Sequence, residues 1–128
     1  MAIRKQAILV VESEPVVCSV VQEILEQDGY LVRTASDLGV AVDKLKELPV
    51  DLMVIGKYIS ETPGAEAVVF LWKKCPKMRV LMMAGFPDDP RVQNRTVLRG
   101  VEVFPPPFHG ADLRKKVKEV LASNRGNG

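Results

Sequence analysis

The sequence predicts an α/β protein with five parallel strands, each followed by a helix. Five short apolar runs of strand length alternate with stretches in which apolar residues recur at helical spacing. The runs over residues 7–11, 52–55 and 80–83 are apolar throughout rather than alternating with polar residues, which is typical of parallel strands covered by helices on both faces. The alternation therefore predicts a doubly wound (βα)5 sheet with right-handed crossovers.

The first strand–helix pair shows the signals most clearly. An apolar strand over residues 7–11 is followed by Ser13, which we expect to cap a helix, with Pro15 early in that helix and Gly29 ending it. The helix carries apolar residues at helical spacing, namely Val16, Val17, Val20, Val21, Ile24 and Leu25.

The later elements follow the same reasoning. In chain order they begin with a strand over 30–34, a helix capped by Ser36 or Asp37 and closed by Pro49, and a strand over 52–55. A loop over 57–63 then leads to a helix through 68–72, which is stopped by Pro76, and to a strand over 80–83. The last predicted elements are a short helix over 89–98, a strand over 101–104, and a helix over 111–122 with Leu113, Val117, Val120 and Leu121 inward.

Composition limits the possible classes of protein. The chain has 128 residues, 47% hydrophobic and 27% charged, which predicts one globular domain over 1–128, with its core at about 6–122 and a frayed end at 123–128. No apolar run approaches the roughly 20 residues that a bilayer requires. The first apolar stretch stops at Glu12, too short for a signal peptide, so we expect a cytoplasmic protein. Cys18 and Cys75 are expected to be reduced and buried.

The net charge of +2 conceals an asymmetry. Residues 1–64 carry 6 Lys/Arg against 10 Asp/Glu, whereas residues 65–128 carry 12 against 6. Such a difference between the halves of a chain bears on where a partner binds.

Chemistry in an open parallel sheet is expected beyond the carboxyl ends of the strands. No glycine-rich phosphate loop occurs there, and the only histidine, His109, has no partner with catalytic or metal-binding spacing. We therefore expect His109 to flank the last helix.

Four motifs at these strand ends resemble the receiver domain of bacterial two-component response regulators. They are Ile8 to Pro15, Asp51 to Gly56 with Gly64 eight residues later, Val80 to Gly85, and Gly100 through Pro107-Phe108. The motifs occur in the family's order and spacing and cover about residues 6–122. The resemblance implies a flavodoxin-like fold with strand order 2-1-3-4-5 and a place in phosphorelay signal transduction.

The resemblance also implies which positions would carry phosphoryl transfer. In the family, an Asp after the third strand accepts the phosphoryl group, and a hydroxyl and a Lys contact its oxygens. Here these three positions hold Gly56, Ala84 and Pro106. Asp51 cannot replace the acceptor, because at about 3.3 Å per residue it lies roughly 16 Å away, at the start of the strand. We therefore expect a pseudo-receiver with no catalytic residue, and not an enzyme.

The family's Mg²⁺ ligands correspond to the acidic pocket formed by Glu12, Ser13 and Glu14. Glu12 keeps a carboxylate, but Ser13 offers only a hydroxyl, which is a poor ligand for a hard, strongly hydrated ion. Glu14 is expected to complement the helix dipole. Mg²⁺ binding is therefore predicted to be weak or absent, and no cofactor is expected.

Partners in the family usually dock on the face made by the fourth helix, the fifth strand and the fifth helix. On that face we expect a basic surface, and with it an acidic protein partner or self-association, from Arg91, Arg95, Arg99, Arg114, Lys115, Lys116 and Lys118. The position of the family's switch aromatic falls on Phe104, or on Val103 if the register differs by one residue. Without a phosphoryl group to sense, we expect Phe104 to be fixed in the core.

Two functions follow as hypotheses. The first is a protein-interaction module that works without phosphorylation. The alternative is a small-molecule or ion sensor that uses the vacated pocket beside Gly56 and Ala84, with Glu12 as a polar anchor. Binding to nucleic acid is disfavoured, because no aromatic residues lie among the basic ones and the net charge is small.

Overall fold

The computed structural model describes residues 5–83, 101–104 and 109–122. These residues form a parallel sheet in the order β2-β1-β3-β6-β7, which confirms the predicted flavodoxin-like order. The strands are β1 (Ala7–Val11), β2 (Leu31–Ala35), β3 (Leu52–Gly56), β6 (Arg79–Met83) and β7 (Val101–Val103). The predicted helix over 89–98 and the predicted frayed end over 123–128 lie outside the described residues.

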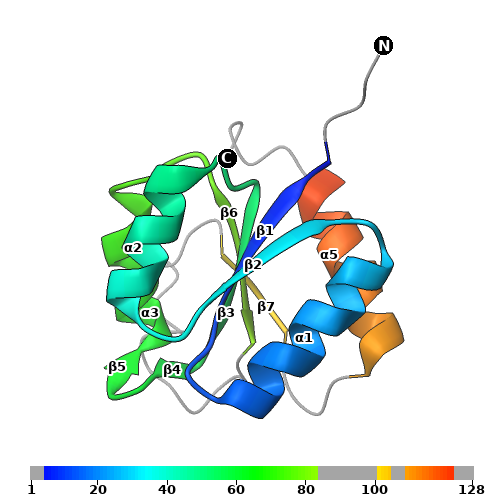
Figure 1. Ribbon diagram of the computed structural model, residues 1–128, viewed down its shortest axis with the longest axis horizontal. Coiled ribbons are helices and arrows are strands. Elements are labelled where there is room, and N and C mark those ends of the chain that lie inside the picture. Colours follow the sequence, from blue (N-terminus) through cyan, green and yellow to red (C-terminus); the bar gives the residue numbers. More distant parts are fainter. Residues whose placement is uncertain (1–4, 84–100, 105–108, 123–128) are drawn as a thin grey trace.

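Helices cover both faces of this sheet. Helices α1 (Pro15–Gln27) and α5 (Gly110–Ala122) lie on one face, and α2 (Leu38–Glu47) and α3 (Gly64–Trp72) lie on the other (Figure 1). All five residues of both β1 and β3 are buried, because helices enclose these central strands from both sides. The four residues predicted to face inward from the last helix are also buried. None of the helices within the described ranges is long and apolar enough to cross a membrane.

Parallel pairing brings the carboxyl ends of the strands to one edge of the sheet. Val11 at the end of β1 pairs with Ala35 of β2 on one side and Ile55 of β3 on the other. The residues that follow these strands are therefore neighbours, at the lower edge of the sheet in Figure 1.

The start of α1 differs from the prediction. Glu14 is the N-cap residue, without a side-chain cap bond, and Ser13 does not cap the helix. Val16 and Val20 are 75% and 43% exposed, so the buried side of α1 is narrower than its apolar positions suggested. Gly29 ends the helix with φ +86°, as predicted.

Residues 57–63 form more than the loop that the sequence predicted. Strand β4 (Tyr58–Ile59) pairs antiparallel with β5 (Thr62–Pro63). Ser60 turns the chain with φ +56°, which is uncommon for a residue other than glycine. The turn lacks the glycine or asparagine that usually indicates a tight hairpin, so the sequence carried no signal for it.

Candidate functional site

The central feature of the strand ends is the position of Glu12 against Gly56. Glu12 directly follows β1 and is only 8% exposed. Its Oε2 accepts a hydrogen bond from the backbone N–H of Glu14 at 3.0 Å. A β-carbon built at residue 56 would lie 2.5 Å from Oε1 of Glu12. The carboxylate therefore fills the space in which a side chain at residue 56 would begin.

Ser13 connects two loops at the same edge. Its Oγ accepts a hydrogen bond at 3.1 Å from the backbone N–H of Ser60, 47 residues later in the chain. This bond joins the loop after β1 to the β4–β5 turn. The hydroxyl of Ser13, which was predicted to cap α1, therefore accepts a hydrogen bond from the β4–β5 turn instead.

These residues do not fit the magnesium ion that the fold family implies. Mg²⁺ requires near-octahedral oxygen ligands and is usually held through carboxylates. The acidic pocket offers one buried carboxylate, that of Glu12, which already accepts an N–H. Ser13 contributes only a hydroxyl that also accepts an N–H, and Glu14 is exposed. Across the described ranges, no three Asp, Glu, His or Cys residues gather as a group that could hold a metal ion.

Gly64, the first residue of α3, lies at the same edge of the sheet, where it packs against the backbone at the end of β3. Its N–H donates to the carbonyl of Lys57 at 2.6 Å. A β-carbon at residue 64 would overlap the backbone oxygen of Gly56. The motif therefore requires glycine at 64, since the first turn of α3 lies directly against the end of β3.

The other predicted site residues are distributed as follows. Asp51 lies at the opposite edge, where its Oδ2 accepts the N–H of Ala7 at 2.8 Å, in keeping with its interpretation as a residue at the start of a strand. Phe104 is half-buried against the apolar cluster under α1 and α5, and its N–H donates to the carbonyl of Met82 at 2.8 Å. Ala84 and Pro106 lie outside the described residues.

The basic face is only partly described, because Arg91, Arg95 and Arg99 also lie outside the described residues. Arg114 donates from Nε and Nη2 to Oδ1 of Asp28, at 3.0 and 2.7 Å. These hydrogen bonds lower the pKa of Asp28 and raise that of Arg114.

The lysines of α5 differ in their contacts. Nζ of Lys116 lies 3.2 Å from Oε2 of Glu102, which is an ion pair. Lys115 and Lys118 are exposed on α5. Lys118 is also close enough to Asp28 to help lower the pKa of that carboxyl.

The parallel sheet, its strand order and the cluster at its carboxyl edge define a receiver-type signalling fold. Residues 8–118 match the model of the response regulator receiver domain, and the chain belongs to this family. No curated protein matches the chain.

Solved structures agree on the fold. A CheY-like receiver domain protein from Methanospirillum hungatei is 23% identical with a TM-score of 0.85, over 98% of this chain and 100% of that one. The receiver domain of NtrX from Brucella abortus is 22% identical with a TM-score of 0.80, over 91% and 99%. The beryllofluoride-activated NtrC4 receiver domain dimer is 23% identical with a TM-score of 0.76, over 90% and 95%.

Proposed function

We propose that this receiver domain acts as a protein-interaction module whose state does not depend on phosphorylation. The observation that carries the proposal is the Glu12 carboxylate lying where a side chain at residue 56 would begin. Position 56 has no nucleophile, and the neighbouring acid occupies the space around it.

The electrostatics of the site also support the proposal. Phosphoryl transfer needs positive charge concentrated on the transferred oxygens. At this edge the buried charge is negative, from Glu12, and the sequence has Ala84 and Pro106 where the family has a hydroxyl and an amine. A phosphoryl group at this position would meet the carboxylate of Glu12, and the sequence has no amine at residue 106 to pair with it.

We further propose that an acidic protein surface or a second copy of the chain binds the exposed side of α5. Lys115 and Lys118 are exposed there, although Lys118 also acts on Asp28, with which Arg114 forms an ion pair. The NtrC4 receiver domain in the comparison is a dimer, so a second copy of the chain is the first partner to test.

Treatment with acetyl phosphate and Mg²⁺, followed by intact-mass spectrometry, tests the first proposal. We expect no phosphate adduct, and no change in the amide NMR spectrum when beryllofluoride and Mg²⁺ are added. Gly56→Asp alone is expected to remain inert, because Ser13, Ala84 and Pro106 are unchanged. An adduct on the native chain would overturn the proposal.

Sedimentation velocity across a range of concentrations tests self-association. We expect Lys115→Glu/Lys118→Glu to weaken any self-association of the native chain, and to do so more at low salt, where charges are less screened. Lys73→Glu/Lys77→Glu, between α3 and β6, is the matched control, since it reverses two other exposed lysines away from α5. Equal effects of both variants would contradict the assignment to α5.

A further inference from the structure

Helix α3 presents apolar side chains to the solvent. Its sequence from Gly64 to Trp72 contains a single charged residue, Glu66, and its buried side packs into the apolar cluster on one face of the sheet. Val69 and Phe70 lie outside this buried side and are 36% and 44% exposed. A surface helix normally turns polar residues to the water, and protein interfaces are enriched in aromatic residues. The exposed side of α3 is therefore a candidate contact surface.

Two lysines extend this apolar side at the end of the helix. Lys73 is the C-cap residue and Lys74 follows it, and both are exposed. They lie three and four residues after Phe70, a spacing that places side chains on one side of a helix. Nζ of Lys74 lies 5.5 Å from the centre of the Phe70 ring, which is a cation–π contact. Within the described ranges neither lysine forms an ion pair with a carboxylate, and we call the two lysines together with Val69 and Phe70 the α3 surface.

The turn after α3 holds the end of this surface in place. The indole Nε1 of Trp72 donates a hydrogen bond to the backbone oxygen of Met78 at 2.7 Å. The N–H of Cys75 donates to the oxygen of Leu71 at 3.2 Å. Met78 is buried, and Cys75 packs against the apolar cluster below the turn. A surface that is ordered before it binds loses less conformational entropy on binding.

The structure divides the basic half of the chain between the two faces of the sheet. Residues 65–128 hold 12 Lys/Arg, and the sequence drew attention to those of α5 and of the predicted helix before it. Helix α3 covers the face of the sheet opposite to α5 (Figure 1), so Lys73 and Lys74 lie apart from the basic residues of α5. The α3 surface is therefore a second basic surface, and its cations adjoin exposed apolar side chains.

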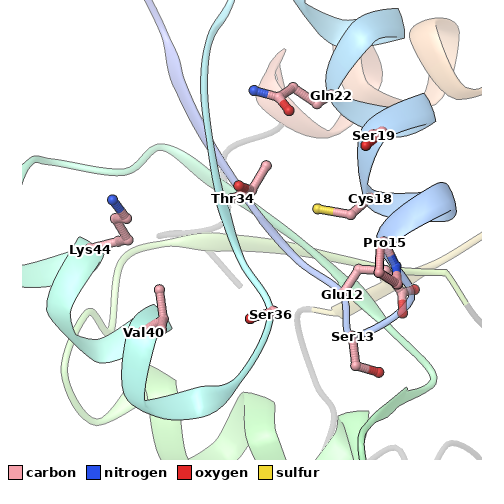
Figure 2. Close-up of a pocket in the computed structure, with 10 residues that line it drawn as sticks. All are labelled: Glu12, Ser13, Pro15, Cys18, Ser19, Gln22, Thr34, Ser36, Val40 and Lys44. Carbon is pink, nitrogen blue, oxygen red and sulfur yellow. The ribbon is translucent and has the colours of Figure 1, made fainter.

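A polar groove of about 440 Å³ between α1 and α2, beside the end of β2, lacks such a combination. Figure 2 shows Lys44 at one side of the groove and the carboxylate of Glu12 turned away from it. Cys18 also lines the groove and, like Cys75, is a free thiol that is half-buried rather than fully buried as the sequence predicted. The groove offers a single cation and no aromatic side chain, so it does not indicate a particular ligand.

We propose that the α3 surface binds an acidic amphipathic segment of another protein. Carboxylates of this segment would pair with Lys73 and Lys74, and a large apolar side chain would cover Val69 and Phe70. Phosphate groups alone would pair with the lysines but leave the two apolar side chains in water, and two lysines attract an anionic bilayer only weakly. This inference goes beyond the proposed role of α5. Its failure would leave that role untouched, because the two surfaces lie on opposite faces of the sheet.

The test is a titration of the full chain with a designed peptide of about 15 residues that has leucines at helical spacing and glutamates on its other side. Trp72 is the only tryptophan of the chain and ends α3, so its fluorescence reports binding beside the surface. We expect a saturable change in this fluorescence and saturable amide NMR shifts at residues 69–74. Two control peptides, one with serine in place of leucine and one with lysine in place of glutamate, are expected to bind at least about tenfold more weakly.

Charge variants test the two lysines. Lys73→Glu/Lys74→Glu should weaken binding of the acidic peptide at least about tenfold, because it replaces two attractions with repulsions. Lys5→Glu/Lys46→Glu is the matched control, since it makes the same change in net charge at two exposed lysines outside α3. This control should change the affinity less than about twofold, because distant exposed charges are screened by salt.

A second pair of variants tests the apolar part of the surface. Phe70→Ser should weaken binding about tenfold, whereas Val16→Ser, at an exposed valine of α1 on the other face of the sheet, should leave it unchanged. The absence of saturable binding, equal affinity for the serine peptide, or equal effects of a variant and its control would overturn the proposal. Binding to phosphatidylserine vesicles, or self-association of the native chain, that Phe70→Ser abolishes would also overturn it, because the surface would then take a membrane or a second copy.

Discussion

The carboxylate of Glu12 lies so close to Gly56 that a β-carbon at residue 56 would stand 2.5 Å from Oε1. Glu12 directly follows β1, and Gly56 is the last residue of β3. These two strands are parallel neighbours, and their register places residues 12 and 56 side by side. A glutamate at 12 and the lack of a side chain at 56 are therefore coupled. The resemblance seen in the sequence predicts an acceptor at one of these positions and a metal ligand at the other, whereas in the structure the two residues pack against each other.

This coupling predicts a non-additive double-mutant cycle. Gly56→Ala should destabilise the native chain by about 1 kcal/mol, because Glu12 must leave its position and its bond to Glu14. In a Glu12→Ala background the same substitution should cost much less, with a coupling free energy of about 0.5–3 kcal/mol. Urea unfolding of the four proteins measures this quantity. Additive effects would show that the contact carries no energy.

Gly64→Ala is expected to be more damaging than Gly56→Ala. Alanine normally favours a helix over glycine by about 1 kcal/mol, and residue 64 begins α3. Here the new β-carbon would meet the backbone oxygen of Gly56, which cannot swing away as a side chain can. We expect a net loss of about 1–3 kcal/mol in urea unfolding. Gly39→Ala is the control, since its β-carbon would meet only a side-chain oxygen of Asp37, at 3.3 Å.

The ion pair between Asp28 and Arg114 predicts a pH-dependent stability. Hydrogen bonds from Arg114 lower the pKa of Asp28 in the folded protein. A depressed carboxyl pKa stabilises the fold above the unfolded pKa of about 3.9, and this contribution disappears as the pH falls through the lower folded value. Asp28→Asn should therefore lower the urea midpoint at neutral pH, and its difference from the native chain should shrink below about pH 4.

Asp43→Asn provides the control for this pair. Asp43 is exposed on α2, and its substitution should leave the midpoint nearly unchanged at every pH. A difference for Asp28→Asn that stays constant down to acidic pH would contradict the role of the ionised carboxylate.

Cys18 should react slowly with alkylating agents at neutral pH. Burial and the nearby negative charge of Glu12 raise the pKa of its thiol above the ordinary value of 9.0, and the thiolate is the reactive form. Its alkylation rate should still be rising above pH 9. Glu12→Gln should shift this profile toward lower pH, because it removes the second of the two causes. An unchanged profile would show that Glu12 does not act on the thiol.

The cap of α2 is the simplest test of the local structure. Oδ1 of Asp37 accepts the backbone N–H of Val40 at 2.8 Å. Asp37→Ala should cost about 1 kcal/mol in thermal or urea unfolding, as the loss of a capping bond usually does. Ser36→Ala, which removes the other cap that the sequence allowed, should cost less than about 0.5 kcal/mol. The reverse order would assign the cap to Ser36.

Local signals in the sequence accounted for most of the fold. The apolar runs located the five strands because a buried parallel strand needs apolar residues on both faces. Gly29 marked one helix end, and Ser36 or Asp37 marked another, because capping effects act within a few residues. The structure assigns the second cap to Asp37. The same reasoning was wrong for Ser13, whose hydroxyl bonds to Ser60 far along the chain. It also missed the β4–β5 pair, whose turn has φ +56° at a serine.

The sequence alone shows that residues 56, 84 and 106 carry no carboxylate, hydroxyl or amine in their side chains, because the chemical groups of a residue do not depend on the fold. The strand order and the burial of β1 and β3 were likewise implied by motifs and apolar pattern. Only the tertiary structure showed that Glu12 fills the space beside Gly56, that Gly64 lies against the backbone of β3, and that Cys18 and Lys44 line one groove. These relationships join residues far apart in sequence, and their distances depend on strand register and helix packing.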